Sequence, residues 1–165
     1  MGRIPTDEFG PREASEPVNA LRDLAAAHRR PEDVMALQIF VNLPVRDLDA
    51  SKAFYEALGF TINPQFTDEN AACVVLSDTV YAMLLTHDFF ASFTPAPRPA
   101  EGTVGALYAL SFDSTDEVDA IVAKALAAGG TATKETGLDG PMYEGGFADP
   151  DGHHWEPFFM DVSQF

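Results

Sequence analysis

Cysteine and positive charge are both scarce in this chain. Cys73 is the only cysteine among 165 residues, which excludes an intrachain disulfide and a zinc site built from several cysteines. Lysine and arginine number 10 against 26 aspartates and glutamates, and the formal net charge is −16. Because phosphate backbones and anionic membrane surfaces repel so acidic a chain, we expect neither nucleic acid nor a membrane as a partner.

Long hydrophobic runs are also absent. No apolar segment approaches the roughly 20 residues of a membrane-spanning helix. The N-terminal sequence MGRIPTDEFGPREASEP has no apolar stretch of the kind found in signal peptides, so we expect a cytoplasmic protein. Hydrophobic residues make up 46% of the chain, which is ordinary for a packed globular protein. The length suits one domain or two small half-domains that share a core.

The composition changes near residue 35. Residues 1–35 contain five arginines, and their first part is rich in glycine, proline and charge. We interpret them as an N-terminal extension with one helix, which begins near Pro17 and runs to about His28. Residues 36–165 form the main domain.

Residues 37–86 have the pattern of a first βαβββ module. The β-branched and aromatic residues of 37–45 predict a strand, and the apolar spacing in 47–58 predicts a helix that ends at a left-handed Gly59. Three more strands are predicted at Thr61–Phe66, Ala71–Ser77 and Tyr81–Thr86.

Residues 87–104 interrupt this pattern. Their second half contains Pro95, Pro97 and Pro99, which argue against regular structure. The three phenylalanines of the first half either pin the linker to the core or form a lid over a pocket, and we favour the first interpretation. They are Phe89, Phe90 and Phe93.

The same order of elements then repeats in residues 105–161. A strand at 106–113 precedes a capping box at Ser114–Glu117 and a helix that ends at Gly129. Further strands are predicted at Thr131–Lys134, Met142–Ala148 and His154–Met160, with a turn at Asp149–Gly152 before the last. Two such modules predict an α+β fold in which a curved mixed sheet has helices on its convex side and a concave cup.

Two segments make the sequence recognisable. QIFVNLPVRDLDASKAFYEALGF (38–60) resembles the opening of the vicinal oxygen chelate superfamily, and FADPDGHHWEPFF (147–159) resembles its closing hairpin. The superfamily includes glyoxalases, bleomycin resistance proteins and extradiol dioxygenases. The resemblance covers about 37–161 and implies a small-molecule site in the cup and a homodimer.

The resemblance also implies four strand positions that hold a divalent metal. They correspond here to Phe40, Leu84 (Met83 if the register shifts by one residue), Leu107 and Glu156. Phe and Leu offer no donor atom, so we expect no cofactor and no standard metal site, with Glu156 as the one remaining ligand. A rearranged site of His87, His154 and Glu156 is an alternative that we consider weaker.

Strand alternation predicts which side chains share the face of these positions. Glu156 and His154 are the candidate catalytic residues, because a carboxylate in an apolar cup can act as a general acid or base, or can bind a ligand amine or guanidinium. The alternative is that Glu156 is hydrogen-bonded to Gln38, Asn42 or His154 and is purely structural. Candidate ligand-binding residues are Gln38, Phe40, Asn42, Leu84, Leu107, Ser111, Tyr143 and Phe158.

Two functions are compatible with this pattern. The first is a binding protein, similar to the bleomycin resistance members, that sequesters a small aromatic molecule, with a positively charged ligand favoured by the acidic surface. The second is a lyase or isomerase of the glyoxalase type that uses Glu156 as its base or within a rearranged metal site. The sequence does not decide between these hypotheses.

Overall fold

The computed structural model describes residues 37–161. The chain divides into two units between Met35 and Ala36, and the predicted N-terminal extension with its helix lies outside the described residues. In the described part, no helix is both long enough and apolar enough to cross a membrane.

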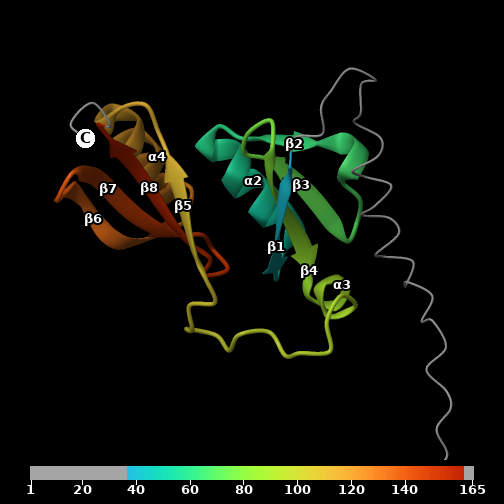
Figure 1. Ribbon diagram of the computed structural model, residues 1–165. Helices are drawn as coiled ribbons and strands as arrows, with labels where there is room; N and C mark the ends of the chain where they lie inside the picture. The colour runs from blue at the N-terminus through green and yellow to red at the C-terminus, as the bar shows by residue number, and fades with distance from the viewer. Residues whose placement is uncertain (1–36, 162–165) are drawn as a thin grey trace, which may run out of the picture. The chain divides into compact units, whose positions relative to one another are not determined.

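The first module is a four-stranded sheet with one long helix, α2 (Figure 1). The strand order is β1-β4-β3-β2, in which β1 and β4 are parallel and the other pairs are antiparallel. The elements are β1 (Ile39–Val45), α2 (Leu48–Leu58), β2 (Thr61–Asn63), the 3-10 helix η1 (Pro64–Phe66), β3 (Ala71–Val75) and β4 (Val80–Thr86).

Local chemistry sets the limits of these elements. The Asp47 side chain accepts a 2.9 Å hydrogen bond from the Ala50 N–H and begins α2, and Gly59 ends it with φ of 105°. The strand predicted at Thr61–Phe66 is too long by three residues. Proline has no N–H to pair with a neighbouring strand, so β2 stops at Asn63 and Pro64 begins η1.

The linker is partly helical. Residues His87–Ala91 form the short helix α3, which directly follows β4, and no regular element is assigned between Ser92 and Ala106. The predicted interruption is therefore correct for the proline-rich half, whereas the first half is a helix. In Figure 1 the linker runs from α3 to β5 and joins the two modules.

The second module repeats the first. Its strand order is β5-β8-β7-β6, with β5 and β8 parallel. Its elements are β5 (Leu107–Ser111), α4 (Thr115–Ala127), β6 (Thr131–Asp139), β7 (Met142–Ala148) and β8 (His154–Met160). The predicted cap of α4 is confirmed, since the Ser114 hydroxyl accepts from the Glu117 N–H at 3.3 Å.

The two sheet orders correspond strand for strand, which confirms the two-module α+β fold. A glycine with positive φ follows each helix, Gly59 directly after α2 (φ 105°) and Gly129 one residue beyond the cap residue Ala128 of α4 (φ 101°). Each module has its own four-stranded sheet, and no strand pairing joins the two sheets within residues 37–161.

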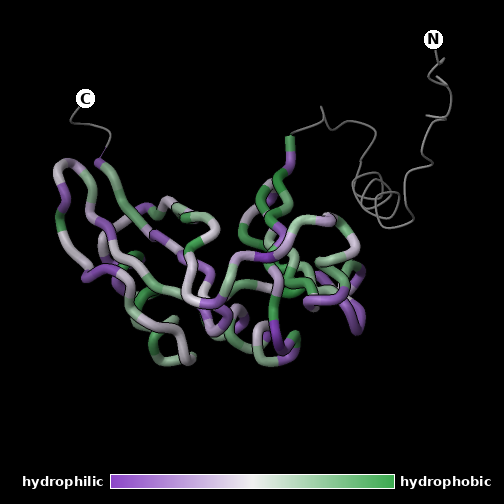
Figure 2. The backbone as a smooth tube through the Cα atoms, turned by 90° about the horizontal axis from the view of Figure 1, so that it is seen from below, coloured by the Kyte–Doolittle hydropathy of each residue, from purple (hydrophilic) through white to green (hydrophobic). Residues whose placement is uncertain are grey.

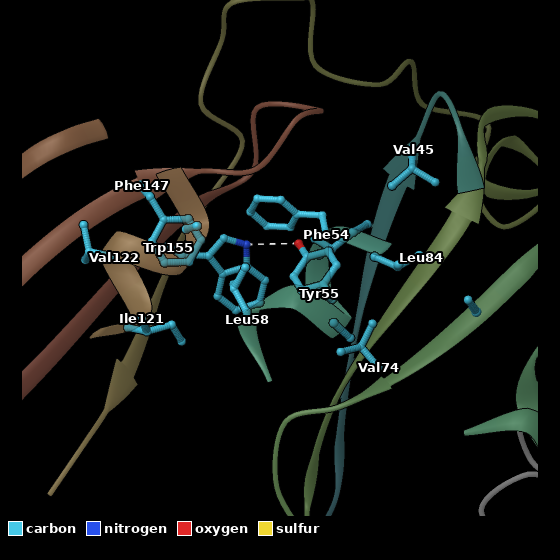
Figure 3. Packing of buried hydrophobic residues seen from close by; sticks show 14 residues of the cluster. Val45, Phe54, Tyr55, Leu58, Val74, Leu84, Ile121, Val122, Phe147 and Trp155 are labelled. Atoms are coloured by element: carbon cyan, nitrogen blue, oxygen red, sulfur yellow. Dashed lines mark hydrogen bonds between the residues drawn. The ribbon is translucent and has the colours of Figure 1, made fainter. Parts of the chain in front are cut away.

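Both modules contribute to one hydrophobic core (Figure 3). Helices α2 and α4 contact each other, and α2 also reaches the second sheet, because Tyr55 and Trp155 meet edge to face with ring centroids 6.0 Å apart. Buried residues of this core are Leu43, Val45, Phe54, Tyr55, Leu58, Ala72, Val74, Ala82, Leu84, Ile121, Val122, Ala125, Phe147 and Trp155. We call the side of each sheet that points away from this core its outer face.

Candidate small-molecule site

The outer face of the first sheet is apolar and aromatic. Phe40 and Tyr81 pair across β1 and β4 and stack with ring centroids 4.8 Å apart and planes 12° apart. Met83 and Leu85 continue the row along β4, and Cys73 comes from β3. The predicted residue Asn42 is exposed and lies opposite Met83, while Gln38 precedes β1 and is half-buried.

The prediction that Leu84 lines the cup is wrong. Leu84 is 0% exposed and packs in the shared core with Val74 and Tyr55 (Figure 3). Side chains alternate along a strand, so a shift of one residue moves the whole row to the other face. Met83, the alternative that the sequence left open, lies on the outer face.

Helix α3 covers part of this face. Phe89, Phe90 and Phe93 pack against the cluster of Cys73, Met83 and Leu85, and the rings of Phe89 and Phe93 meet edge to face at 5.1 Å. These contacts agree with the interpretation that the phenylalanines pin the linker to the module. Cys73 beneath them is 0% exposed, and burial raises the pKa of its thiol to about 11.

The outer face of the second sheet is more open. Leu107 is 58% exposed on β5, and Ser111 at the end of the same strand is also exposed. The parallel register pairs Leu107 with His154 and Ser111 with Phe158, so these four residues share one face as predicted. The two modules also differ in composition along the chain, since hydrophobic stretches are more frequent in the first module and hydrophilic ones in the second (Figure 2).

Glu156 stands in the middle of this second outer face. It is half-buried and lies between Ala109 of β5, its register partner, and Gly146 of β7, which the register of β7 and β8 places opposite it. Both neighbours are too small to reach the carboxylate. Among residues 37–161, no side chain or backbone group forms a hydrogen bond or ion pair with the Glu156 carboxylate. The hydrogen bonds to Gln38, Asn42 or His154 that the structural alternative required are therefore not formed in this part of the chain.

Lys134 of β6 lies on the same face as Glu156. It pairs with Glu144 of β7 and with Asp139 at 3.3 Å, and the hydrogen bond that it donates to Glu144 is the first cause that raises the Lys134 pKa. Lys134 lies in register with Gly146, beside the strand position opposite Glu156. Its charge is already balanced by two carboxylates, so no cation in the described part of the chain pairs with Glu156.

The prediction that Tyr143 approaches the cup is wrong. In β7, Tyr143 alternates with Glu144 and points to the helix side, where its hydroxyl donates a 2.9 Å hydrogen bond to Asp119 of α4. Tyr143 instead lines a small cavity of about 210 Å³, and none of the other predicted ligand-binding residues lines it. The cavity is lined by Thr115, Leu138, Gly140, Pro141, Tyr143, Phe159 and Asp161.

Comparisons with known proteins agree with this architecture. Residues 38–77 match the family described as bleomycin resistance protein-like N-terminal. The solved structure of the hypothetical protein SA1046 from S. aureus is 30% identical with a TM-score of 0.65, and the match covers 76% of this chain and 95% of that one. A glyoxalase/bleomycin resistance protein from Albidiferax ferrireducens T118 is 25% identical with a TM-score of 0.58, covering 74% and 97%. The chain belongs to the vicinal oxygen chelate superfamily.

Other similarities extend the fold comparison. A glyoxalase/bleomycin resistance protein/dioxygenase family enzyme from Burkholderia phytofirmans PsJN has a TM-score of 0.65 at 21% identity, covering 76% of this chain and all of that one. No curated protein matches the chain significantly. Membership in the vicinal oxygen chelate superfamily fixes the fold and leaves the chemistry to the individual site.

The usual divalent metal of the vicinal oxygen chelate superfamily does not fit the donors of this chain. The corresponding outer-face positions hold Phe40, Met83, Leu107 and Glu156. Only Glu156 and Met83 among them have a donor atom, and one carboxylate with one soft thioether is too few and too soft a set of ligands for a hard or borderline divalent ion. Residues 37–161 contain no group of three or more His, Cys, Asp or Glu side chains arranged to hold a metal, and the ring of His87 is bonded to Arg98.

The sequence did not reveal a polar network behind the site. The turn at Asp149–Gly152 docks on the start of α2, where Asp151 accepts hydrogen bonds from the Arg46 N–H at 3.0 Å, the Arg46 Nε at 2.9 Å and the Ser51 hydroxyl at 3.1 Å. Arg46 also donates to the Pro150 carbonyl. The sequence predicts the turn at Asp149–Gly152, but no local pattern indicates partners for its aspartates about a hundred residues away.

Proposed function

We propose that this protein binds a small organic molecule on the outer face of its second sheet, with Glu156 as the anchor for a positively charged group and without the divalent metal of its superfamily. The observation that supports this most directly is the unpartnered, half-buried Glu156 carboxylate between Ala109 and Gly146. Removing a carboxylate from water is costly unless a donor or cation compensates.

A ligand amine or guanidinium would provide that compensation. A charge-assisted hydrogen bond to a partly desolvated carboxylate is stronger than a neutral one. Phe158, two residues further along the same face, offers a ring for the apolar part of the ligand. The formal net charge of −16 favours the approach of cations over anions.

We propose in addition that two copies associate through their outer faces. The inner faces of both sheets pack on one core, so the outer faces point away from that core and from each other. A cup enclosed by both types of face therefore needs a second chain. Leu107, an apolar side chain that is 58% exposed, is available for such a contact. Sedimentation equilibrium should show a dimer that Leu107→Lys dissociates, and a monomeric wild type would contradict this part.

The binding proposal is tested with benzamidine as the cationic probe and benzyl alcohol as the neutral one. We expect benzamidine to raise the thermal midpoint of the purified protein and benzyl alcohol to have little effect. Glu156→Gln should weaken benzamidine binding about tenfold or more, as expected for loss of a hydrogen bond to a charged group.

Glu56→Gln is the matched control. It makes the same charge change at an exposed position of α2, away from the outer face, and should leave benzamidine binding unchanged. Equal affinity of the wild type and Glu156→Gln would overturn the assignment of the anchor. A stoichiometric divalent metal in the purified protein would overturn the metal-free part.

A second candidate function is catalysis with Glu156 as general base. It is favoured by His154, which lies two residues away on the same face and could transfer a proton in the opposite sense. In this case 2-oxoaldehyde thiohemiacetals, the substrates of glyoxalase-type lyases, should be turned over by the wild type and by neither Glu156→Gln nor His154→Ala. Turnover that survives Glu156→Gln would exclude this mechanism.

A further inference from the structure

Positive charge is scarce in the described part of the chain, and most of it is already paired. Residues 37–161 contain five lysines and arginines. Arg46, Lys52 and Lys134 form ion pairs with carboxylates, and Lys124 donates to the Leu58 carbonyl at the end of α2. Arg98 is the remaining cation, and within residues 37–161 its guanidinium has no carboxylate partner.

Arg98 is held in place by a histidine. Its Nη1 lies 3.2 Å from Nε2 of His87, the first residue of α3. A guanidinium only donates hydrogen bonds, so Nε2 of His87 must accept and the ring must be neutral with its proton on Nδ1. Burial first, and then the charge of Arg98, lower the pKa of His87, which agrees with a neutral ring.

This pair lies at the edge of the apolar outer face of the first sheet. His87 follows β4 directly and begins α3, which packs on the apolar cluster through Phe89 and Phe90. Arg98 lies within the proline-rich segment, between Pro97 and Pro99, and is exposed. Its contact with His87 holds this segment to the first residue of α3. The result is an exposed guanidinium that is held by one hydrogen bond to His87 and has further N–H donors.

The other charges near the pair are accounted for. On the neighbouring strand end, Arg46 is bound to Asp151 and the Pro150 carbonyl, so these two charges largely cancel. Asp88 on α3 and Glu101 in the linker are exposed, and both act on this region only through space. None of these carboxylates forms an ion pair with Arg98.

We propose that Arg98, positioned by His87, forms a binding site for an oxyanion of a small molecule, a carboxylate or a phosphate. The planar fork of a guanidinium matches both groups with two parallel hydrogen bonds. His87 is a positioning residue. It holds Arg98 through Nη1 alone and leaves the other N–H donors of the guanidinium for the anion. The site is on the first module and does not depend on Glu156 or on the function proposed above.

The test uses the side-chain NMR signals of His87 and of the Arg98 Nε–H in the full chain. Acetate, benzoate and inorganic phosphate are titrated at constant ionic strength, with chloride as the reference anion. We expect saturable shifts of both signals and a rise of the His87 pKa when the anion is bound. Saturation by the carboxylates alone or by phosphate alone would identify the class of ligand, and either supports the site.

Variants separate this site from general charge effects. Arg98→Ala should weaken anion binding about tenfold or more, because a charge-assisted bidentate contact is lost. His87→Gln keeps an acceptor for the guanidinium and should retain most of the affinity, whereas His87→Ala should lose it.

Two controls have the opposite expectation. Lys52→Ala removes a cation of α2 that is paired with Asp49, and Glu156→Gln alters the other module, so both should bind anions as the wild type does. Shifts that follow ionic strength without saturating, or binding that survives Arg98→Ala, would overturn the proposal.

Discussion

The Tyr55 hydroxyl donates a 2.7 Å hydrogen bond to the Asp149 carboxylate, which links α2 of the first module to the turn between β7 and β8 of the second. The same hydroxyl oxygen accepts from the Trp155 indole N–H at 3.1 Å. Tyr55 is 1% exposed and Asp149 is 4% exposed. Burial, followed by the neighbouring Asp149 charge, raises the pKa of Tyr55 well above its ordinary value, so the phenol stays a donor.

Tyr55→Phe should destabilise the protein by about 1–3 kcal/mol. The substitution keeps the packing of the ring but leaves a buried carboxylate oxygen and a buried indole N–H without their partner. The free energy of unfolding in urea measures the effect. Tyr143→Phe is the matched control, because its hydroxyl bonds to the exposed Asp119 and its loss should cost no more than about 0.5 kcal/mol. Equal losses in the two variants would show that the buried network adds nothing.

Phe89→Ala should expose Cys73 to thiol reagents. Phe89 packs on the cluster that contains Cys73, and removing its ring lowers the free energy needed to detach α3 from the sheet. If this opening free energy falls by about 1.4 kcal/mol, the thiol reacts about tenfold faster. Modification of the native protein by a chromogenic disulfide reagent measures the rate. Leu138→Ala removes a side chain that is 80% exposed on the other module, and the rate there should equal that of the wild type.

The stability of the protein should fall between pH 9 and pH 11, in part because of Cys73. Its thiol has a pKa of about 11 when folded and an ordinary value of 9.0 when unfolded. Above pH 9 the unfolded chain therefore loses this proton first, and unfolding is favoured increasingly as the pH rises. The thiol contribution is on the order of 2 kcal/mol by pH 11. Urea unfolding of wild type and Cys73→Ala across this range isolates it, and parallel curves for the two proteins would contradict the prediction.

Much of the fold could be predicted from the sequence because its signals are local. The bounds of β7 and β8 agree with the predicted ranges, α4 begins at the predicted cap, and α2 begins within one residue of the predicted range. The repeat also follows from local patterns, since both modules present the same elements in the same order.

The candidate site was harder to predict for two reasons. A one-residue change of strand register decides which side chains face the site, and some contacts join residues far apart in the sequence. Leu84 and Met83 differ only by the register of β4, and nothing in the alternation of an apolar strand such as VYAMLLT indicates which residue faces the core. The bond between Tyr55 and Asp149 joins residues 94 positions apart, which no local pattern reveals. Glu156 could be placed because the closing motif fixes its strand and its face.

The two helix ends offer a direct test of the internal repeat. Gly59→Ala and Gly129→Ala should each cost about 1 kcal/mol, because both residues have a positive φ that disfavours a side chain. Neither cost should include a severe clash, since an added Cβ would meet only Lys124 Nζ at 3.6 Å in the first case and nothing within 4 Å in the second. Gly137→Ala is the control, because it has the same free space without a positive φ and should be neutral or slightly stabilising. Urea unfolding of the three variants measures the costs, and a loss at Gly59 or Gly129 no larger than that at Gly137 would contradict the cost assigned to the positive φ.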